Sequence, residues 1–85
     1  MHEYVTFPDE TTVAFSDLLD DGTVEVLVER PTDDGFDTAS YSLPSLAIGG
    51  TSGFSDTELD ELSGFIARNA PIITSLAREN ERMYA

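Results

Sequence analysis

Alternating apolar and polar residues predict β-strands throughout the first half of the chain. The alternation is clearest over residues 23–30, where three valines fall on one face and Glu25, Leu27 and Glu29 fall on the other. Three further strands are expected, over residues 4–7, 12–19 and 36–43. Because short turns join consecutive strands, the pattern predicts a four-stranded antiparallel meander in sequence order.

The turn between the second and third of these strands leaves their register open. The Asp-Gly dipeptide at residues 21–22 is typical of a two-residue type I′ turn. That turn would place the carboxylate of Asp17 beside Val26 on the apolar face, where its burial would be costly. Either the strand contains a bulge near Ser16, or the turn has three residues and Asp17 lies opposite Glu25.

The second half of the chain has the periodicity of an amphipathic helix. Ser55 and Glu58 match a capping box at its start. Phe54 and Leu59 match the hydrophobic staple that accompanies such a box. Apolar residues then recur at intervals of three or four: Leu59, Leu62, Ile66, Ala70, Ile73 and Ala77. This stripe predicts a helical segment with one apolar face.

Pro71 lies within the apolar stripe without changing its phase. It either kinks one long helix or begins a second one, which would give helices at roughly 56–69 and 71–82. All 85 residues are then expected to form a single domain. Its three parts are an antiparallel sheet at 1–48, a Gly/Ser linker at 49–54 and a helical segment at 55–83. This order predicts an α+β fold with the helix packed on one sheet face.

The apolar faces of the sheet and the helix supply the expected core. A chain of 85 residues has room for one modest core and for no large internal cavity. We expect twelve side chains in it: Val5, Phe7, Phe15, Val24, Val26, Val28, Tyr41, Leu59, Leu62, Ile66, Ile73 and Leu76.

Negative charge dominates the composition. Seventeen acidic residues stand against four arginines and no lysine, for a formal net charge of −13. Eleven of the acids lie in residues 1–50, where Arg30 is the single cation. Such a chain repels nucleic acids and anionic membranes, because phosphate binding depends on lysine and arginine. It is attracted to basic surfaces instead, most strongly at low salt.

The sequence contains no constellation typical of an enzyme. His2 is the sole histidine, and it lies at an end of the chain that is expected to fray. The chain has no cysteine, so nucleophilic sets that need a histidine or a thiolate are not expected. The acidic segment at 33–37 lacks the spacing of a calcium loop, and the glycines at 49–53 lack the lysine of a phosphate-binding loop. We expect no catalysis, no cofactor, no metal and no small-molecule ligand.

A line of carboxylates along the third predicted strand is the remaining functional signal. Glu25 and Glu29 lie about 13 Å apart on the face opposite the valines. Aspartate pairs at the two ends of the strand extend this line, and the start of the helix carries a second group. The candidate partner-binding residues are Asp20, Asp21, Glu25, Glu29, Asp33, Asp34, Asp37, Asp56, Glu58, Asp60 and Glu61.

In size, charge and architecture, the chain resembles small acidic inhibitors from phages and mobile elements, such as anti-CRISPR proteins and other DNA mimics. The resemblance implies a binding protein that inhibits a nucleic-acid-binding protein or complex by occupying its basic surface. It implies no direct contact with nucleic acid or membrane. The resemblance implies a prokaryotic host cell. A cytoplasmic location is expected because cysteine is absent, no apolar run could span a membrane and the first residues lack a signal-peptide pattern.

A second hypothesis explains the acidity without a basic partner. The chain would then be a non-catalytic structural or regulatory interaction module, whose charge is an adaptation to solubility or to a high-salt environment. Salt tests the high-salt version of this hypothesis, because a chain adapted to high salt needs molar salt to fold.

Overall fold

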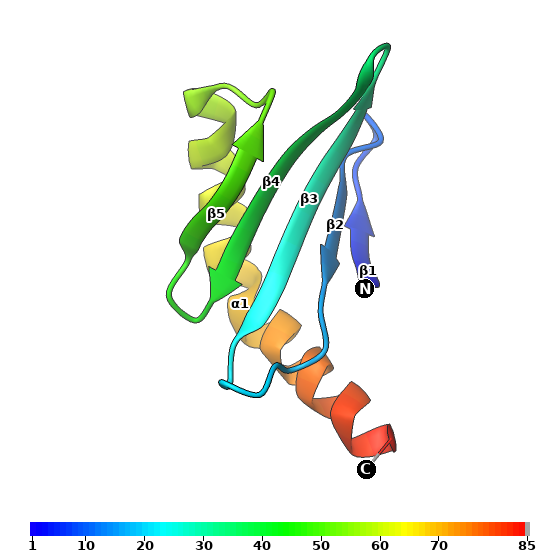
Figure 1. The fold of residues 1–85 in the computed structure, drawn as a ribbon, viewed down its shortest axis with the longest axis vertical. Helices are drawn as coiled ribbons and strands as arrows, with labels where there is room; N and C mark the ends of the chain where they lie inside the picture. Colours follow the sequence, from blue (N-terminus) through cyan, green and yellow to red (C-terminus); the bar gives the residue numbers. More distant parts are fainter. Residues whose placement is uncertain (85) are drawn as a thin grey trace.

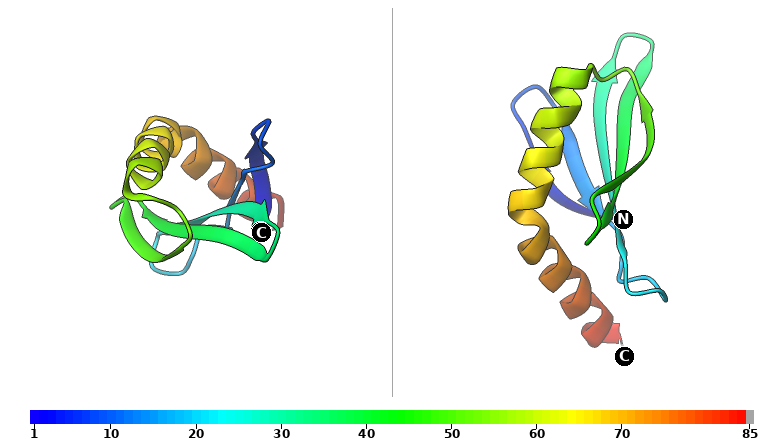
Figure 2. Two further views of the ribbon diagram at one scale, coloured as in Figure 1. Left: turned by 90° about the horizontal axis from the view of Figure 1, so that it is seen from above. Right: turned by 90° about the vertical axis from the view of Figure 1, so that its left-hand side faces the viewer.

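One antiparallel sheet and one helix make up the computed structural model, which describes the backbone of residues 1–84 and the side chains of residues 1–80 (Figure 1). The strands are β1 (His2–Thr6), β2 (Thr12–Phe15), β3 (Val24–Thr32), β4 (Gly35–Leu43) and β5 (Ala47–Ser52), and the helix is α1 (Asp56–Tyr84). The strands lie in the order β1-β2-β3-β4-β5. Figure 2 shows α1 crossing one face of the sheet. The predicted α+β meander with a C-terminal helix is confirmed, but the sheet has five strands and not four.

The fifth strand occupies most of the segment that the sequence predicts to be a linker. β5 pairs with β4 through Thr38↔Ser52 and Ser42↔Ala47, and the register shifts between these pairs. A Cβ on Gly49 would collide with the Ser40 hydroxyl, and this hydroxyl accepts a hydrogen bond from the Gly50 backbone nitrogen at 2.9 Å. Gly49 therefore permits close approach of the two strands. Every residue of β5 is exposed, which explains why no apolar alternation marks it.

The β2–β3 connection has the three-residue turn of one predicted alternative, but Asp17 does not lie opposite Glu25. Leu19 and Thr23 pair through a backbone hydrogen bond across three residues, and Gly22 takes the left-handed conformation (φ 83°) that ends such a turn. The expected strand over residues 12–19 ends at Phe15, which lies opposite Val26. Ser16, rather than Asp17, bonds to Glu25, and Asp17 is exposed. The turn has three residues and the register shifts by one residue between Leu19 and Ser16, which keeps a carboxylate out of the core.

The helix runs without a break through Pro71, so of the two alternatives considered from the sequence, the second helix is wrong and a single long helix is found. A proline at this position leaves the carbonyl of Ala67 without its helical donor. Both Pro71 and Ala67 are exposed, so water can hydrogen-bond that carbonyl. The helix axis bends along its length and follows the sheet face (Figure 2). The phase of the apolar stripe is kept on both sides of the proline.

The core lies between α1 and the concave face of the sheet. Its buried apolar side chains are Val13, Phe15, Val24, Val26, Val28, Ala39, Tyr41, Leu43, Ile66, Ile73 and Ala77. Four of the expected core residues are partly buried against this cluster: Val5, Phe7, Leu59 and Leu62. The prediction is wrong for Leu76, which is 36% exposed. Ala77, four residues after Ile73, lies in line with it on the buried stripe. Leu76, three residues after Ile73, lies beside the stripe and faces solvent.

The N-terminal strand is tied to the rest of the fold at two points. The Tyr4 hydroxyl donates a hydrogen bond to Asn69 Oδ1 of α1 at 2.7 Å. The His2 ring lies 2.6 Å from the Asp17 carboxylate through Nε2, and its centroid is 5.3 Å from that of Phe15. His2, expected at a loose end of the chain, therefore lies in a paired strand. The expected first strand starts two residues too late for the same reason.

Candidate functional site

The face of the sheet opposite α1 carries the predicted line of glutamates. On β3, Val24, Val26 and Val28 are buried beneath the helix, whereas Glu25 is exposed and Glu29 is half-buried on the other side. The alternation predicted from the sequence is confirmed. Among the arginine side chains described within residues 1–80, Arg30 faces α1 and the other two, Arg68 and Arg78, belong to α1. No arginine in this part of the chain neutralises the outer face.

Aspartates occupy the turns at both ends of β3. Asp33 and Asp34 form the two-residue turn to β4, between the paired residues Thr32 and Gly35. Asp20 and Asp21 lie in the turn at the opposite end, and all four aspartates are exposed. The nine residues of β3 span about 27 Å between these turns. The outer glutamates and the two turns therefore form one elongated acidic surface, which we call the outer acidic face: Asp20, Asp21, Glu25, Glu29, Asp33 and Asp34.

One member of the outer acidic face also has a structural role. Asp21 Oδ1 accepts hydrogen bonds from the Thr23 hydroxyl at 2.6 Å and from the Thr23 backbone nitrogen at 3.0 Å. These two bonds, the hydroxyl first, hold the pKa of Asp21 below its ordinary value. The carboxylate that closes the turn is therefore firmly ionised.

Arg30 binds two of the predicted partner-binding carboxylates within the molecule. Asp37 Oδ2 accepts hydrogen bonds from Arg30 Nη2 at 2.7 Å and from Nε at 3.0 Å. Glu58 Oε2 accepts a bond from Nη1, and the guanidinium carbon lies 4.7 Å from the centroid of the Phe54 ring. Asp37 and Glu58 are thus paired within the molecule, and their role in partner binding stays a prediction. A half-buried cation needs such partners, and here it joins two strands to the start of α1.

The start of the helix is built as the sequence predicts, with Arg30 added. Ser55 Oγ accepts a bond from the Glu58 backbone nitrogen at 3.2 Å, and Glu58 Oε1 accepts one from the Ser55 backbone nitrogen at 3.0 Å. The hydrogen bond from Arg30, followed by the bonds from Ser55, lowers the pKa of Glu58 to about 2. The same ion pairs raise the pKa of Arg30 above its ordinary value. One carboxylate therefore both caps α1 and anchors it to β3.

A turn signal in the sequence could have located the Arg30–Asp37 pair. If Asp33-Asp34 is read as a two-residue turn, the register that follows places Arg30 opposite Asp37, as the structure does. Gly53 completes the cluster. It has a φ of 91°, and a Cβ added to it would collide with the Asp37 carboxylate. The contact with Glu58 joins residues 28 positions apart, and no local pattern predicts it.

The remaining candidates lie on the other side of the molecule. Asp56, Asp60 and Glu61 are exposed residues in the first two turns of α1, which covers the inner face of the sheet. The structure does not join them to the outer acidic face. The eleven predicted residues are therefore divided between an outer surface, the cluster at Arg30 and the helix start.

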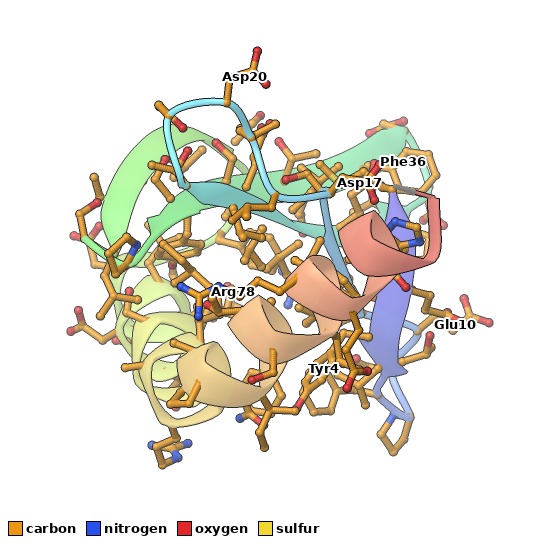
Figure 3. The ribbon with its side chains drawn as sticks, turned by 90° about the horizontal axis from the view of Figure 1, so that it is seen from below. Tyr4, Glu10, Asp17, Asp20, Phe36 and Arg78 are labelled. Carbon is orange, nitrogen blue, oxygen red and sulfur yellow. The ribbon has the colours of Figure 1, made fainter. Side chains whose placement is uncertain are left out.

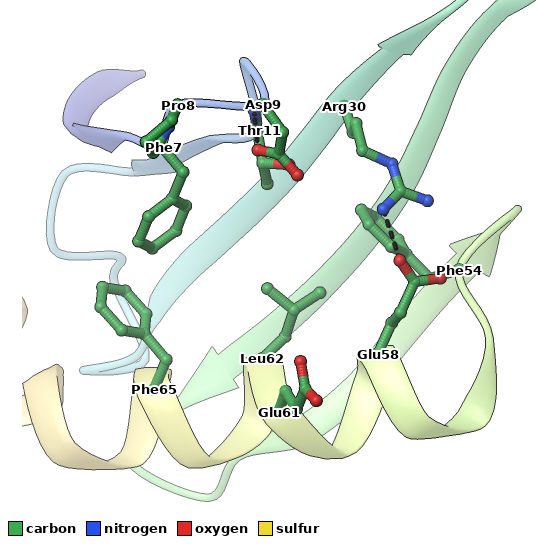
Figure 4. A pocket seen from close by; sticks show the side chains of 10 residues that line it. All are labelled: Phe7, Pro8, Asp9, Thr11, Arg30, Phe54, Glu58, Glu61, Leu62 and Phe65. Carbon is green, nitrogen blue, oxygen red and sulfur yellow. Dashed lines mark hydrogen bonds and ion pairs between the residues drawn. The ribbon is translucent and has the colours of Figure 1, made fainter.

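A pocket of about 420 Å³ opens beside Arg30, between the β1–β2 turn and the first turns of α1 (Figure 4). Its apolar lining consists of Phe7, Pro8, Phe54, Leu62 and Phe65, and its polar lining consists of Asp9, Thr11, Arg30, Glu58 and Glu61. The rings of Phe7 and Phe65 meet edge to face at 5.2 Å. The sequence analysis did not identify this pocket, because its walls come from four separate segments.

Asp9 is held at the rim of the pocket by the β1–β2 turn. Its Oδ1 accepts a hydrogen bond at 3.0 Å from the backbone nitrogen of Thr11, a buried residue. That bond is the main cause of a pKa below the ordinary value for Asp9. Figure 4 shows Asp9 and Glu61 on opposite walls of the pocket, with Leu62 between them.

Comparison with known proteins gives no information about the function of this chain. No protein-family model, curated protein or solved structure matches this chain. Within the residues that the structure describes, no group of three or more His, Cys, Asp or Glu side chains could hold a metal ion. No helix in that part of the chain is long and apolar enough to cross a membrane.

Proposed function

We propose that this protein binds the basic surface of a nucleic-acid-binding protein or complex through its outer acidic face, and inhibits it by excluding nucleic acid. In this proposal the protein acts in the cytoplasm of a prokaryotic cell, without an enzymatic step. The observation that carries it is the uncovered sheet face with Glu25 and Glu29, flanked by acidic turns and free of arginine in the described residues.

The elongated arrangement of the charges supports competition with a phosphate backbone. Glu25 and Glu29 lie about 13 Å apart on β3, and the two aspartate pairs lie in the turns beyond its ends. Phosphates along one strand of DNA repeat more closely, at about 3.4 Å, so the carboxylates would meet only some of the cations that bind a DNA backbone. Arginine and lysine on a partner would meet the carboxylates in charge-assisted hydrogen bonds. Long-range attraction would accelerate the encounter at low salt.

Capture followed by displacement tests this function. The wild-type protein, immobilised, is exposed to an extract of the cells that produce it, and the retained proteins are then challenged with duplex DNA. The proposal expects at least one retained nucleic-acid-binding protein that the DNA displaces. Retention only of proteins that duplex DNA does not displace would contradict it.

The distribution of charge over the whole molecule favours one second candidate function. Glu10 and Asp20 project from different sides of the molecule (Figure 3), and further exposed carboxylates lie on α1. Such a distribution is typical of acidity that solvates a whole surface. An interaction module adapted to high salt would require molar salt to fold, because salt screens its self-repulsion. Full thermal stability in about 0.1 M salt would exclude this candidate.

A further inference from the structure

The pocket beside Arg30 has an excess of negative charge that nothing within it neutralises. Three carboxylates and one guanidinium line it. Arg30 is already bonded to Glu58 and Asp37 and lies over the Phe54 ring, so its charge is satisfied. The carboxylates of Asp9 and Glu61 remain, on opposite walls of the pocket (Figure 4). Neither forms an ion pair among the described residues.

The rest of the lining is apolar and partly aromatic. Phe7 and Phe65 form one end of the pocket, and Leu62 lies on the helix side between the two carboxylates (Figure 4). A volume of about 420 Å³ falls within the range of pockets that bind small ligands. A ligand that fits needs an apolar stem to cover Leu62 and Phe65, and a cationic end for Asp9 and Glu61. A phosphate would be repelled by the same carboxylates.

We propose that this pocket binds an arginine side chain of the basic partner, a proposal that rests on the function proposed above. Arginine combines an apolar stem with a planar, weakly hydrated cation that stacks on aromatic rings and bonds to carboxylates. Arg30 itself shows this mode of packing, between two carboxylates and the Phe54 ring. The pocket lies on the helix side of the sheet, so it gives the protein a second contact, separate from the outer acidic face.

A small arginine analogue tests the pocket without the partner. The probe is Nα-acetyl-L-arginine amide, titrated into the isotopically labelled full chain and followed by NMR. Nα-acetyl-L-citrulline amide, which has the same shape and no charge, is the control ligand. The proposal expects saturable shifts at Phe7, Leu62 and Phe65 with the arginine probe and none with citrulline.

Two variants with the same change in net charge locate the binding. Asp9→Asn with Glu61→Gln removes the two pocket charges and keeps an oxygen at residue 9 for the Thr11 bond. Glu25→Gln with Glu29→Gln removes two charges from the outer acidic face. The first pair is expected to weaken probe binding at least about fivefold, because it removes both charge-assisted contacts. The second double variant is expected to bind the probe within about twofold of wild type, because its substitutions act on the pocket only through long-range electrostatics.

The proposal is overturned if the probe causes no saturable shifts at the pocket, if citrulline matches arginine, or if both variant pairs weaken binding equally. The last result would mean that the probe responds to net charge and to no particular site. The titration uses no partner protein, so its failure leaves the capture experiment open. Equally, if the capture fails, the arginine titration can still be interpreted, because it needs no partner.

Discussion

Arg30 is the single cation in the first fifty residues, and two carboxylates bind it, one 7 and one 28 residues along the chain. Its partners are Asp37 on β4 and Glu58 in the first turn of α1. A guanidinium with about a quarter of its side chain exposed gains more from such bonds than a surface ion pair does. Within a chain of net charge −13, these acids are structural, in contrast to Glu25 and Glu29.

Acid titration tests the structural role of Glu58. Its pKa in the folded protein is about 2, against an ordinary value of 4.5, so the ionised form is favoured by folding. This stabilisation is complete above about pH 4.5 and is lost as the pH falls toward 2. Glu58→Gln is therefore expected to lower the thermal midpoint by several degrees at pH 7 and by almost nothing near pH 2. Thermal melts monitored by circular dichroism across this range measure the difference.

Glu61→Gln is the matched control for this titration. It removes one carboxylate from the same helix, three residues along, and Glu61 forms no ion pair among the described residues. It is expected to raise the midpoint slightly at pH 7, because net repulsion falls. A pH-independent effect of Glu58→Gln, or the same profile in both variants, would contradict the assigned role of the Arg30–Glu58 pair.

At the scale of elements, the sequence predicts those structures whose signals are local. The alternation of β3 and the capping box of α1 depend on neighbouring residues, and the structure confirms both. β5 was missed because it is an exposed edge strand with two glycines, which have no side chains to alternate. Its formation depends on β4, through the close approach of Gly49 to Ser40. Pairing with β4 therefore determines that β5 is a strand, and no local sequence pattern predicts it.

The continuity of α1 has a similar explanation. A proline usually ends a helix because it removes one backbone donor and crowds the preceding turn. Pro71 lies on the exposed side of α1, while Ile66, Ile73 and Ala77 are buried against the sheet on both sides of it. Packing of the apolar stripe therefore outweighs the local cost of the proline.

Two substitutions to alanine test the assignment of the buried face of α1. Ile66 is fully buried, so Ile66→Ala is expected to lower the free energy of unfolding by about 2–5 kcal/mol. Leu76 is 36% exposed, so Leu76→Ala is expected to cost less than about 1 kcal/mol. Urea denaturation of the two variants measures both values. Equal losses, or a larger loss at Leu76, would contradict this orientation of the helix.

At the scale of the whole molecule, the helix divides the acidic residues between two sides. α1 covers the inner face, so the outer acidic face remains open to a partner. Alternation in β3 was sufficient to predict this surface from the sequence. The pocket beside Arg30 could not be predicted, because Phe7, Arg30, Phe54 and Phe65 meet only through the tertiary fold.

The central claim is that the outer acidic face binds a basic partner. The position of the carboxylates on the molecule, rather than the total net charge, is expected to determine this binding. The test variant carries Glu25→Gln, Glu29→Gln, Asp33→Asn and Asp34→Asn, which changes the net charge from −13 to −9. The matched control carries four substitutions elsewhere with the same change in charge: Glu10→Gln, Asp56→Asn, Asp60→Asn and Glu79→Gln. Both variants are expected to fold, because every substituted side chain lies at the surface or half-buried without a hydrogen bond in the described structure.

The most direct measurement is the association of wild type, test variant and control with the captured partner, by surface plasmon resonance across a salt series. The account predicts that the test variant binds at least about tenfold more weakly at 0.1 M salt, chiefly through a slower on-rate, and that the loss shrinks as salt rises. The control is predicted to stay within about threefold of wild type. Equal binding by test variant and wild type, or equal losses in test variant and control, would contradict the claim that this face is the binding surface.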